Sequence, residues 1–92
     1  MAFTGPQEFY QLVAATQVNT PLSFGFDVSN VLFVNAGPQT VYITVSALIA
    51  TTSMFPLNSG EQVAVTLNNP SEGAGLICAA GQTASVRVWA LQ

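Results

Sequence analysis

The sequence is poor in charge of either sign, and it contains no lysine and no histidine. Charged side chains make up 5% of its 92 residues, against about 25% in an ordinary soluble domain. Arg87 is the single cation, and four acids bring the net charge to −3. Because recognition of nucleic-acid phosphates requires several Lys or Arg side chains, we expect no nucleic-acid partner.

The commonest catalytic groups are also missing. Histidine is absent and Cys78 is the only cysteine, so neither a Ser-His nor a Cys-His arrangement can be assembled and no internal disulfide can form. Cys78 lies in an apolar run, which predicts an inert buried thiol. Glu61 and Glu72 fall at predicted turns or loops, and the four acids are too scattered to form a metal ligand set. We therefore expect no enzyme activity, no metal and no cofactor.

Long apolar runs are missing as well. No segment approaches the roughly 18 apolar residues of a membrane span, and the first residues lack the basic start and apolar stretch of a secretory signal. We expect no membrane partner and synthesis in the cytoplasm. What the sequence does have is a hydrophobic fraction of 50%, which excludes disorder because disordered chains combine low hydrophobicity with high charge.

Alternation of apolar and polar residues with period two is the clearest structural signal. Such alternation occurs in residues 40–49, 62–67 and 83–91, and shorter apolar runs occupy 28–34 and 75–79. Turn residues separate the runs at 35–38, 58–60, 68–70 and 80–82. This spacing predicts an all-β fold, a jelly-roll-like antiparallel β-sandwich of about six to eight short strands. Its predicted inward residues are Val41, Ile43, Val45, Val63, Val65, Val86 and Val88.

The first 20 residues allow two interpretations. Residues 4–7 resemble a helix-capping signal, and the apolar residues that follow have helical spacing. The same stretch also fits an opening strand over residues 9–18, which we favour, preceded by an arm that contains Phe3. We therefore assign residues 1–20 to an N-terminal arm or opening strand and residues 21–92 to the β-sandwich of a single domain.

Half of the residues are hydrophobic, and a chain of this size is too small to bury all of their side chains. Small domains that have no disulfide and no metal site are usually stabilised by oligomerisation. Arg and Trp are enriched among residues that dominate binding energy. The candidate interface residues are Phe3, Phe9, Tyr10, Arg87 and Trp89. Two alternatives stay open: Arg87 as a solvated charge that discourages edge pairing, and Trp89 with Tyr10 and Tyr42 as a surface for sugar stacking.

Three segments carry a resemblance to a known family. Residues 31–43 lead through Asn-Ala-Gly into Val-Tyr-Ile, residues 55–61 have the sequence Phe-Pro-Leu-Asn-Ser-Gly-Glu, and residues 79–88 place Ala-Gly-Gln-Thr before the closing strand. This layout resembles that of small β-sandwich virion proteins of tailed bacteriophages. The resemblance implies a non-enzymatic structural protein of the virion, made in the host cytoplasm, with capsid decoration or cement as the expected role.

The partners that the resemblance implies are further copies of the chain, expected as a trimeric homo-oligomer, and other virion proteins such as the major capsid protein. Two alternative functions stay open. One is a head-tail junction or tail component of the same particle. The other is a small carbohydrate- or receptor-binding β-sandwich module.

Overall fold

The computed structural model describes residues 8–45, 51–52 and 54–92. These residues form six strands: β1 (Glu8–Ala15), β2 (Thr20–Pro38), β3 (Val41–Thr44), β4 (Phe55–Leu57), β5 (Gln62–Cys78) and β6 (Ala84–Leu91). The described part of the chain contains no helix, and every strand pair is antiparallel. The predicted all-β antiparallel fold is therefore confirmed. Among these residues no helix is long and apolar enough to cross a membrane.

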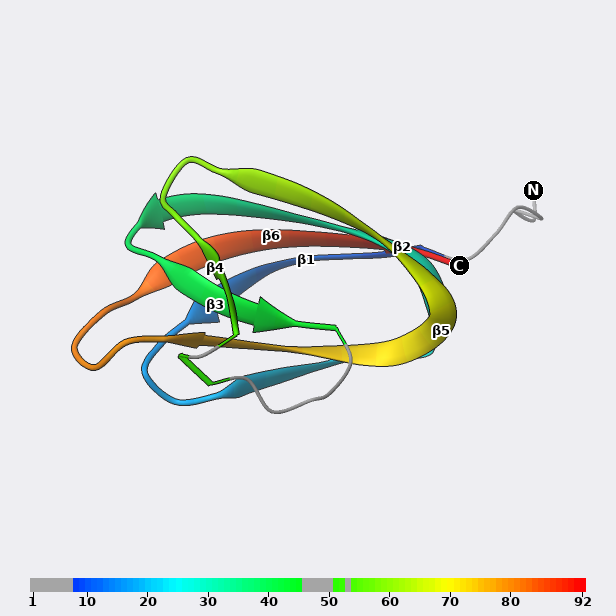
Figure 1. The fold of residues 1–92 in the computed structure, drawn as a ribbon, viewed down its shortest axis with the longest axis horizontal. Coiled ribbons are helices and arrows are strands. Elements are labelled where there is room, and N and C mark those ends of the chain that lie inside the picture. The colour runs from blue at the N-terminus through cyan, green and yellow to red at the C-terminus, as the bar shows by residue number, and fades with distance from the viewer. Residues whose placement is uncertain (1–7, 46–50, 53) are drawn as a thin grey trace.

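Two long strands, β2 and β5, organise the sheet. Residues 20–23 of β2 pair with residues 73–76 of β5, and residues 30–34 pair with residues 62–66. The register shifts between these two paired regions, where both strands bend, and Figure 1 shows the bend of β5 at one end of the molecule. The sheet order is β1-β6-β2-β5-β3-β4. The six strands thus form one continuous sheet that folds over itself, which is compatible with the predicted sandwich.

The bend divides this sheet into two half-sheets. We call β1, β6, residues 30–38 of β2 and residues 62–66 of β5 the first half-sheet. The second half-sheet contains the start of β2, the end of β5, β3 and β4. In Figure 1, β3 and β4 lie in front of β6 and β1. Each half-sheet therefore has one inner and one outer face.

The inner faces of the two half-sheets share one apolar core. Its largest fully buried side chains include Phe33 and Val88 of the first half-sheet and Leu57 and Leu76 of the second. All seven predicted inward residues belong to this core: Val41, Ile43, Val86 and Val88 are buried, and Val45, Val63 and Val65 pack against them half-buried. The faces predicted from alternation are correct, because a period of two places one side of each strand against the core.

Among the residues whose burial the structure describes, one polar side chain, that of Asn35, is fully buried. Its Nδ2 donates hydrogen bonds to the carbonyl oxygens of Gln39 and Leu57, both at 2.8 Å, and its Oδ1 accepts one from the Gly37 amide at 2.8 Å. A buried amide is tolerated when its hydrogen-bonding groups are satisfied. Asn35 therefore ties the end of β2 to β4 and to the segment that precedes β3.

Two predicted turns lie inside strands, and these predictions are wrong. Residues 35–38 belong to the end of β2, where the register with β6 shifts between Asn35 and Gly37 and Gly37 adopts a φ of 94°. Residues 68–70 belong to β5, in the stretch where that strand bends. Bulges and bends use the same Gly, Asn and Pro residues as turns, so composition alone does not separate them. The predicted turns at 58–60 and 80–82 do connect strands.

The beginning of the described chain is a strand. Residues 8–15 form β1, so the preferred opening strand is confirmed there and the helical alternative is wrong. The arm, residues 1–7 with Phe3, lies outside the described residues, as do residues 46–49 at the end of the alternating run at 40–49. Two of the predicted short strands merge into longer ones, because 28–34 lies within β2 and most of 75–79 lies within β5.

Candidate interaction surface

Tyr10 and Trp89 lie side by side on the outer face of the first half-sheet. Tyr10 of β1 is paired with Trp89 of β6, which is paired on its other side with Leu32 of β2. Tyr10 is 63% exposed and Trp89 is 43% exposed. Strand pairing therefore brings the two aromatic side chains together from opposite ends of the chain and turns both toward solvent.

A second row of outward side chains lies next to the first. Leu12 of β1 is paired with Arg87 of β6, which is paired in turn with Val34 of β2. Leu12 is 58% exposed, and the only cation of the chain thus lies between two aliphatic residues. We call the outward residues of the two rows the outer face: Tyr10, Leu12, Leu32, Val34, Arg87 and Trp89.

Alternation in β6 explains why these side chains face outward. Four small or β-branched residues of β6 are buried: Ala84, Val86, Val88 and Ala90. The intervening Ser85, Arg87 and Trp89 are exposed. Because successive side chains of a strand point to opposite faces, burial of the first set against the core turns the second set outward.

Glu8 fixes the edge of the Trp89 ring. The Trp89 Nε1 donates a hydrogen bond of 2.9 Å to Glu8 Oε2. Glu8 stands at the start of β1, paired with Leu91, so it is the next outward residue beside Tyr10. A carboxylate acceptor makes this a charge-assisted hydrogen bond, which satisfies the one polar group of the indole while the ring stays half exposed.

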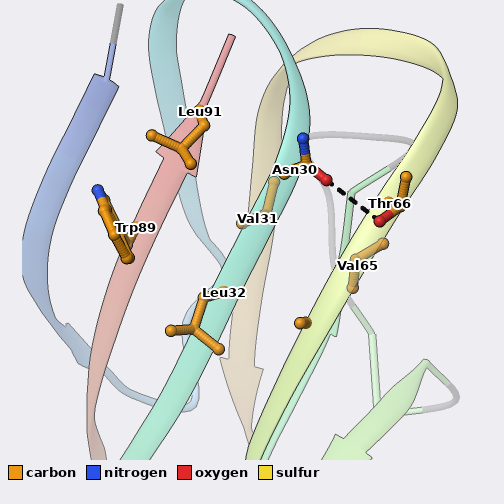
Figure 2. A pocket seen from close by; sticks show the side chains of 8 residues that line it. Asn30, Val31, Leu32, Val65, Thr66, Trp89 and Leu91 are labelled. Atoms are coloured by element: carbon orange, nitrogen blue, oxygen red, sulfur yellow. Dashed lines mark hydrogen bonds between the residues drawn. The ribbon is translucent and has the colours of Figure 1, made fainter.

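A shallow hollow of about 170 Å³ lies beside Trp89 on the same face. Figure 2 shows Trp89 and Leu91 on β6, Leu32 on β2, and Asn30 and Thr66 at one end of the hollow. Leu32 is paired with Ala64 of β5, whose small side chain leaves space next to it. The Thr66 hydroxyl donates a 3.1 Å hydrogen bond to Asn30 Oδ1, so the hollow has an apolar floor and a polar end.

The predicted interface residues fall into three groups. Tyr10, Arg87 and Trp89 come together on the outer face. Phe9 points to the core side, where it packs edge to face on Phe24 with ring centroids 5.0 Å apart. Phe3 lies outside the described residues.

Sequence reasoning missed three residues of the outer face, Leu12, Leu32 and Val34, and it also missed Glu8 beside them. Leu12 alternates with Tyr10 along β1, so its outward position follows from the preferred strand interpretation. The contact of Glu8 with Trp89 carried no such signal, because it depends on the pairing of the first and last strands.

Cys78 is buried, as predicted, with 1% of its surface exposed. Its thiol lies 3.7 Å from the carbonyl oxygen of Ala15, and burial raises the pKa of the Cys78 thiol. A raised pKa keeps the sulfur in its unreactive protonated form at neutral pH. Among the described residues, no three His, Cys, Asp or Glu side chains lie close enough together to hold a metal ion.

The comparisons with known proteins add no family to this description. Neither the protein-family models nor the curated proteins give a match to the chain.

Proposed function

We propose that the chain is a non-enzymatic structural protein of a tailed-phage virion, and that it acts as a capsid decoration or cement protein. The observation that carries the proposal is the outer face, where aromatic and aliphatic side chains of β1 and β6 are exposed in a fixed register. The virion setting comes from the resemblance of residues 31–43, 55–61 and 79–88. In this role the protein associates with further copies of itself and with other virion proteins such as the major capsid protein.

The chemistry of the outer face suits a protein partner. Trp, Tyr and Arg are the residues that most often dominate binding energy in interfaces, and Tyr10, Arg87 and Trp89 are neighbours here. Strand pairing and the Glu8 hydrogen bond hold Trp89 before a partner arrives, so binding immobilises fewer side chains and loses less entropy. A cement protein requires such a preformed surface, since its role is to bury surface area where it contacts other virion proteins.

The proposal is tested on particles of the phage whose genome carries the gene. We expect mass spectrometry of purified particles to detect the chain in a fixed ratio to the major capsid protein. Particles that lack the gene product should release their genome at a lower temperature, and adding the purified chain should restore the higher one. Absence of the chain from intact particles would contradict the proposal.

A matched pair of variants then tests the surface. Trp89→Ala removes an exposed aromatic side chain from the outer face, whereas Phe55→Ala removes one, 55% exposed, from β4 in the second half-sheet. We expect Trp89→Ala to weaken binding to particles at least about tenfold, as hot-spot truncations do. Phe55→Ala should bind like the wild type. Equal losses would show that the outer face is not the surface that binds the particle.

A second candidate function, a carbohydrate-binding module, is favoured by the hollow beside Trp89. Sugar sites combine an aromatic face with a few placed polar groups, and here a half-exposed indole lies near Asn30 and Thr66. Titration of the chain with mono- and oligosaccharides, followed by Trp fluorescence, separates the two candidates because Trp89 is the single tryptophan. A decoration protein gives no saturable change, whereas a glycan-binding module does.

A further inference from the structure

β1 has one edge without a partner in the described part of the chain. It is the outermost strand of the first half-sheet and pairs with β6 alone. The amide and carbonyl groups along such an edge form a template for another strand. The partner that this chemistry calls for is therefore an extended backbone segment.

Among the described residues, residues 62–66 of β5 pair with β2 alone and form a second open edge, but the two remaining edges of the sheet carry features that discourage strand addition. β4 has three residues, one of which is Pro56, and proline cannot donate to a ladder. The start of β2 contains Pro21 and is followed by a register shift. β1 in contrast has eight residues, EFYQLVAA, in unbroken register with β6. It lacks Pro, Gly, Lys and Arg, the residues with which proteins usually guard an edge.

We propose that the β1 strands of two copies of this chain pair antiparallel around a two-fold axis, with Gln11 opposite Gln11 of the second copy. Opposite residues of an antiparallel pair lie on the same face, so a residue and not a peptide bond must lie on the axis. With Gln11 there, the pair extends over residues 8–14. Tyr10 then lies opposite Leu12 on the outer face, and Phe9 lies opposite Val13 on the core side.

This register fits the exposed apolar side chains better than its neighbours. Leu12 on the axis would place Tyr10 opposite Ala14 and leave its ring mostly uncovered. Tyr10 on the axis would shorten the pair to residues 8–12 and set Glu8 opposite Leu12. Only the Gln11 register covers the 63% exposed Tyr10 and the 58% exposed Leu12 with each other, twice by symmetry.

Charge placement is also compatible with self-pairing. Glu8 is the only charged residue of β1, and in the proposed register it lies opposite Ala14. The two Glu8 residues are then separated by the length of six residues, about 20 Å, which exceeds the Debye length of about 10 Å at 0.1 M salt. Each Glu8 also keeps its hydrogen bond to Trp89 of its own copy.

The proposed contact forms a closed dimer and requires no other protein. A two-fold contact uses the same surface on both copies and ends with two subunits. The trimer expected from the family resemblance requires a head-to-tail contact instead, such as the addition of β1 of one copy to residues 62–66 of β5 in the next. The inference goes beyond the proposed function, since purified protein should form the pair whether or not it belongs to a virion.

A cysteine on the axis tests the register. In Gln11→Cys the two new thiols lie on residues whose Cα atoms are about 4.5–5.5 Å apart, within the range that a disulfide spans. The native Cys78 is buried and does not compete. After oxidation with oxidised glutathione at micromolar protein, we expect most of Gln11→Cys to migrate as a dimer on a non-reducing gel. Ser85→Cys, exposed on the adjacent strand β6, should stay monomeric.

Two outcomes would overturn the register. One is a covalent dimer yield for Gln11→Cys no higher than for Ser85→Cys. The other is preferential cross-linking of Leu12→Cys to Gln62→Cys, two residues on the outer side of the sheet, when the two variants are mixed, which would indicate head-to-tail addition of β1 to β5.

A non-covalent measurement tests the contact without cysteine chemistry. Leu12→Lys places a charge on the proposed edge, and Val18→Lys places the same charge on a 68% exposed residue between β1 and β2. By sedimentation velocity over a range of concentrations, we expect Leu12→Lys to raise the dimer dissociation constant at least tenfold and Val18→Lys to change it less than twofold. Circular dichroism confirms that both variants fold. Wild-type dimerisation of Leu12→Lys would refute the β1 contact.

Discussion

The corner around Asn35 and the outer face of β1 and β6 break the usual distribution of residues in opposite ways. At the corner a polar side chain is fully buried, and both its donor and its acceptor atoms are used within the chain. On the outer face, Tyr10, Leu12 and Trp89 are apolar side chains left in solvent. Buried polar groups and exposed apolar patches are the informative exceptions in a fold.

The difference between the two regions separates folding from assembly. The groups at the Asn35 corner are satisfied by the chain itself, so this region specifies how β2 meets β4 and the start of β3. The outer face buries only part of its apolar area on folding, because Trp89, Leu12 and Tyr10 stay 43%, 58% and 63% exposed when the core is complete. Substitutions at the corner should therefore change the free energy of unfolding, and substitutions on the outer face should change association.

The largest expected effect is that of Asn35→Asp. The substitution keeps the shape of the side chain but replaces the donor to Gln39 and Leu57 by a carboxylate oxygen, which leaves a buried charge facing two carbonyl groups. We expect the free energy of unfolding to fall by about 3–5 kcal/mol, measured by urea denaturation.

Asn30→Asp is the matched control for this change. Asn30 is exposed and accepts a hydrogen bond from Thr66 through Oδ1, an interaction that a carboxylate preserves. Its unfolding free energy should stay within about 0.5 kcal/mol of the wild type. Equal losses at the two positions would contradict the role assigned to the Asn35 corner.

The next prediction compares an apolar residue buried in the core with an apolar residue on the outer face. Ile43 is 4% exposed in the core, so Ile43→Ala should lower the free energy of unfolding by about 2–5 kcal/mol. Leu12→Ala removes a similar side chain from the outer face and should cost no more than about 0.5 kcal/mol. Thermal melting followed by circular dichroism measures both. A larger loss for Leu12→Ala than for Ile43→Ala would reverse the assignment of faces.

A smaller effect concerns two glycines with positive φ. A Cβ on Gly37, at φ 94°, would lie 2.5 Å from Ser59 Oγ, whereas a Cβ on Gly60, at φ 84°, would meet nothing within 4 Å. Backbone strain alone should cost about 1–3 kcal/mol for Gly→Ala at either position, and Gly37→Ala should be the more destabilising of the two. Adding Ser59→Ala to Gly37→Ala should remove the difference in urea denaturation. A persistent difference would show that the clash with Ser59 is not its cause.

The smallest effect is the alkaline titration of Cys78. Because burial raises the pKa of the Cys78 thiol in the folded chain, the unfolded chain loses its proton first as the pH rises. The stability contribution is therefore complete below the ordinary thiol pKa of about 8.5 and decreases above it, by at most about 1.4 kcal/mol per pH unit. Urea denaturation between pH 7 and 10 should show a steeper decline for the wild type than for Cys78→Ala. Parallel declines would contradict the buried thiol.

Local patterns in the sequence predicted the strands and their faces but not their length. In residues 84–91 the alternation follows the burial of every second side chain, because the period of a strand depends on the backbone alone. The continuity of β2 and β5 could not be predicted in this way. Residues 35–38 and 68–70 have the composition of turns but lie inside bent strands. Whether such a segment forms a turn or a bend depends on the neighbouring strand with which it pairs.

Three members of the candidate surface were predictable from the sequence, but its other members and its arrangement were not. Tyr10, Arg87 and Trp89 are candidate interface residues on predicted strands. Their proximity depends on the pairing of β1 with β6, which joins the two ends of the described chain and is not encoded in any local pattern. The Asn35 network was missed for the same reason, since Leu57 reaches Asn35 only through the fold.

We expect the exposed apolar residues of the first half-sheet to make a contact between protein chains. Sedimentation velocity of the purified wild-type chain at micromolar concentration, in low salt and in about 1 M salt, tests it most directly, because contacts between charges weaken with ionic strength and apolar contacts do not. We expect the same oligomer in both conditions. A stable monomer in both would contradict the claim, and dissociation by salt alone would contradict its apolar chemistry.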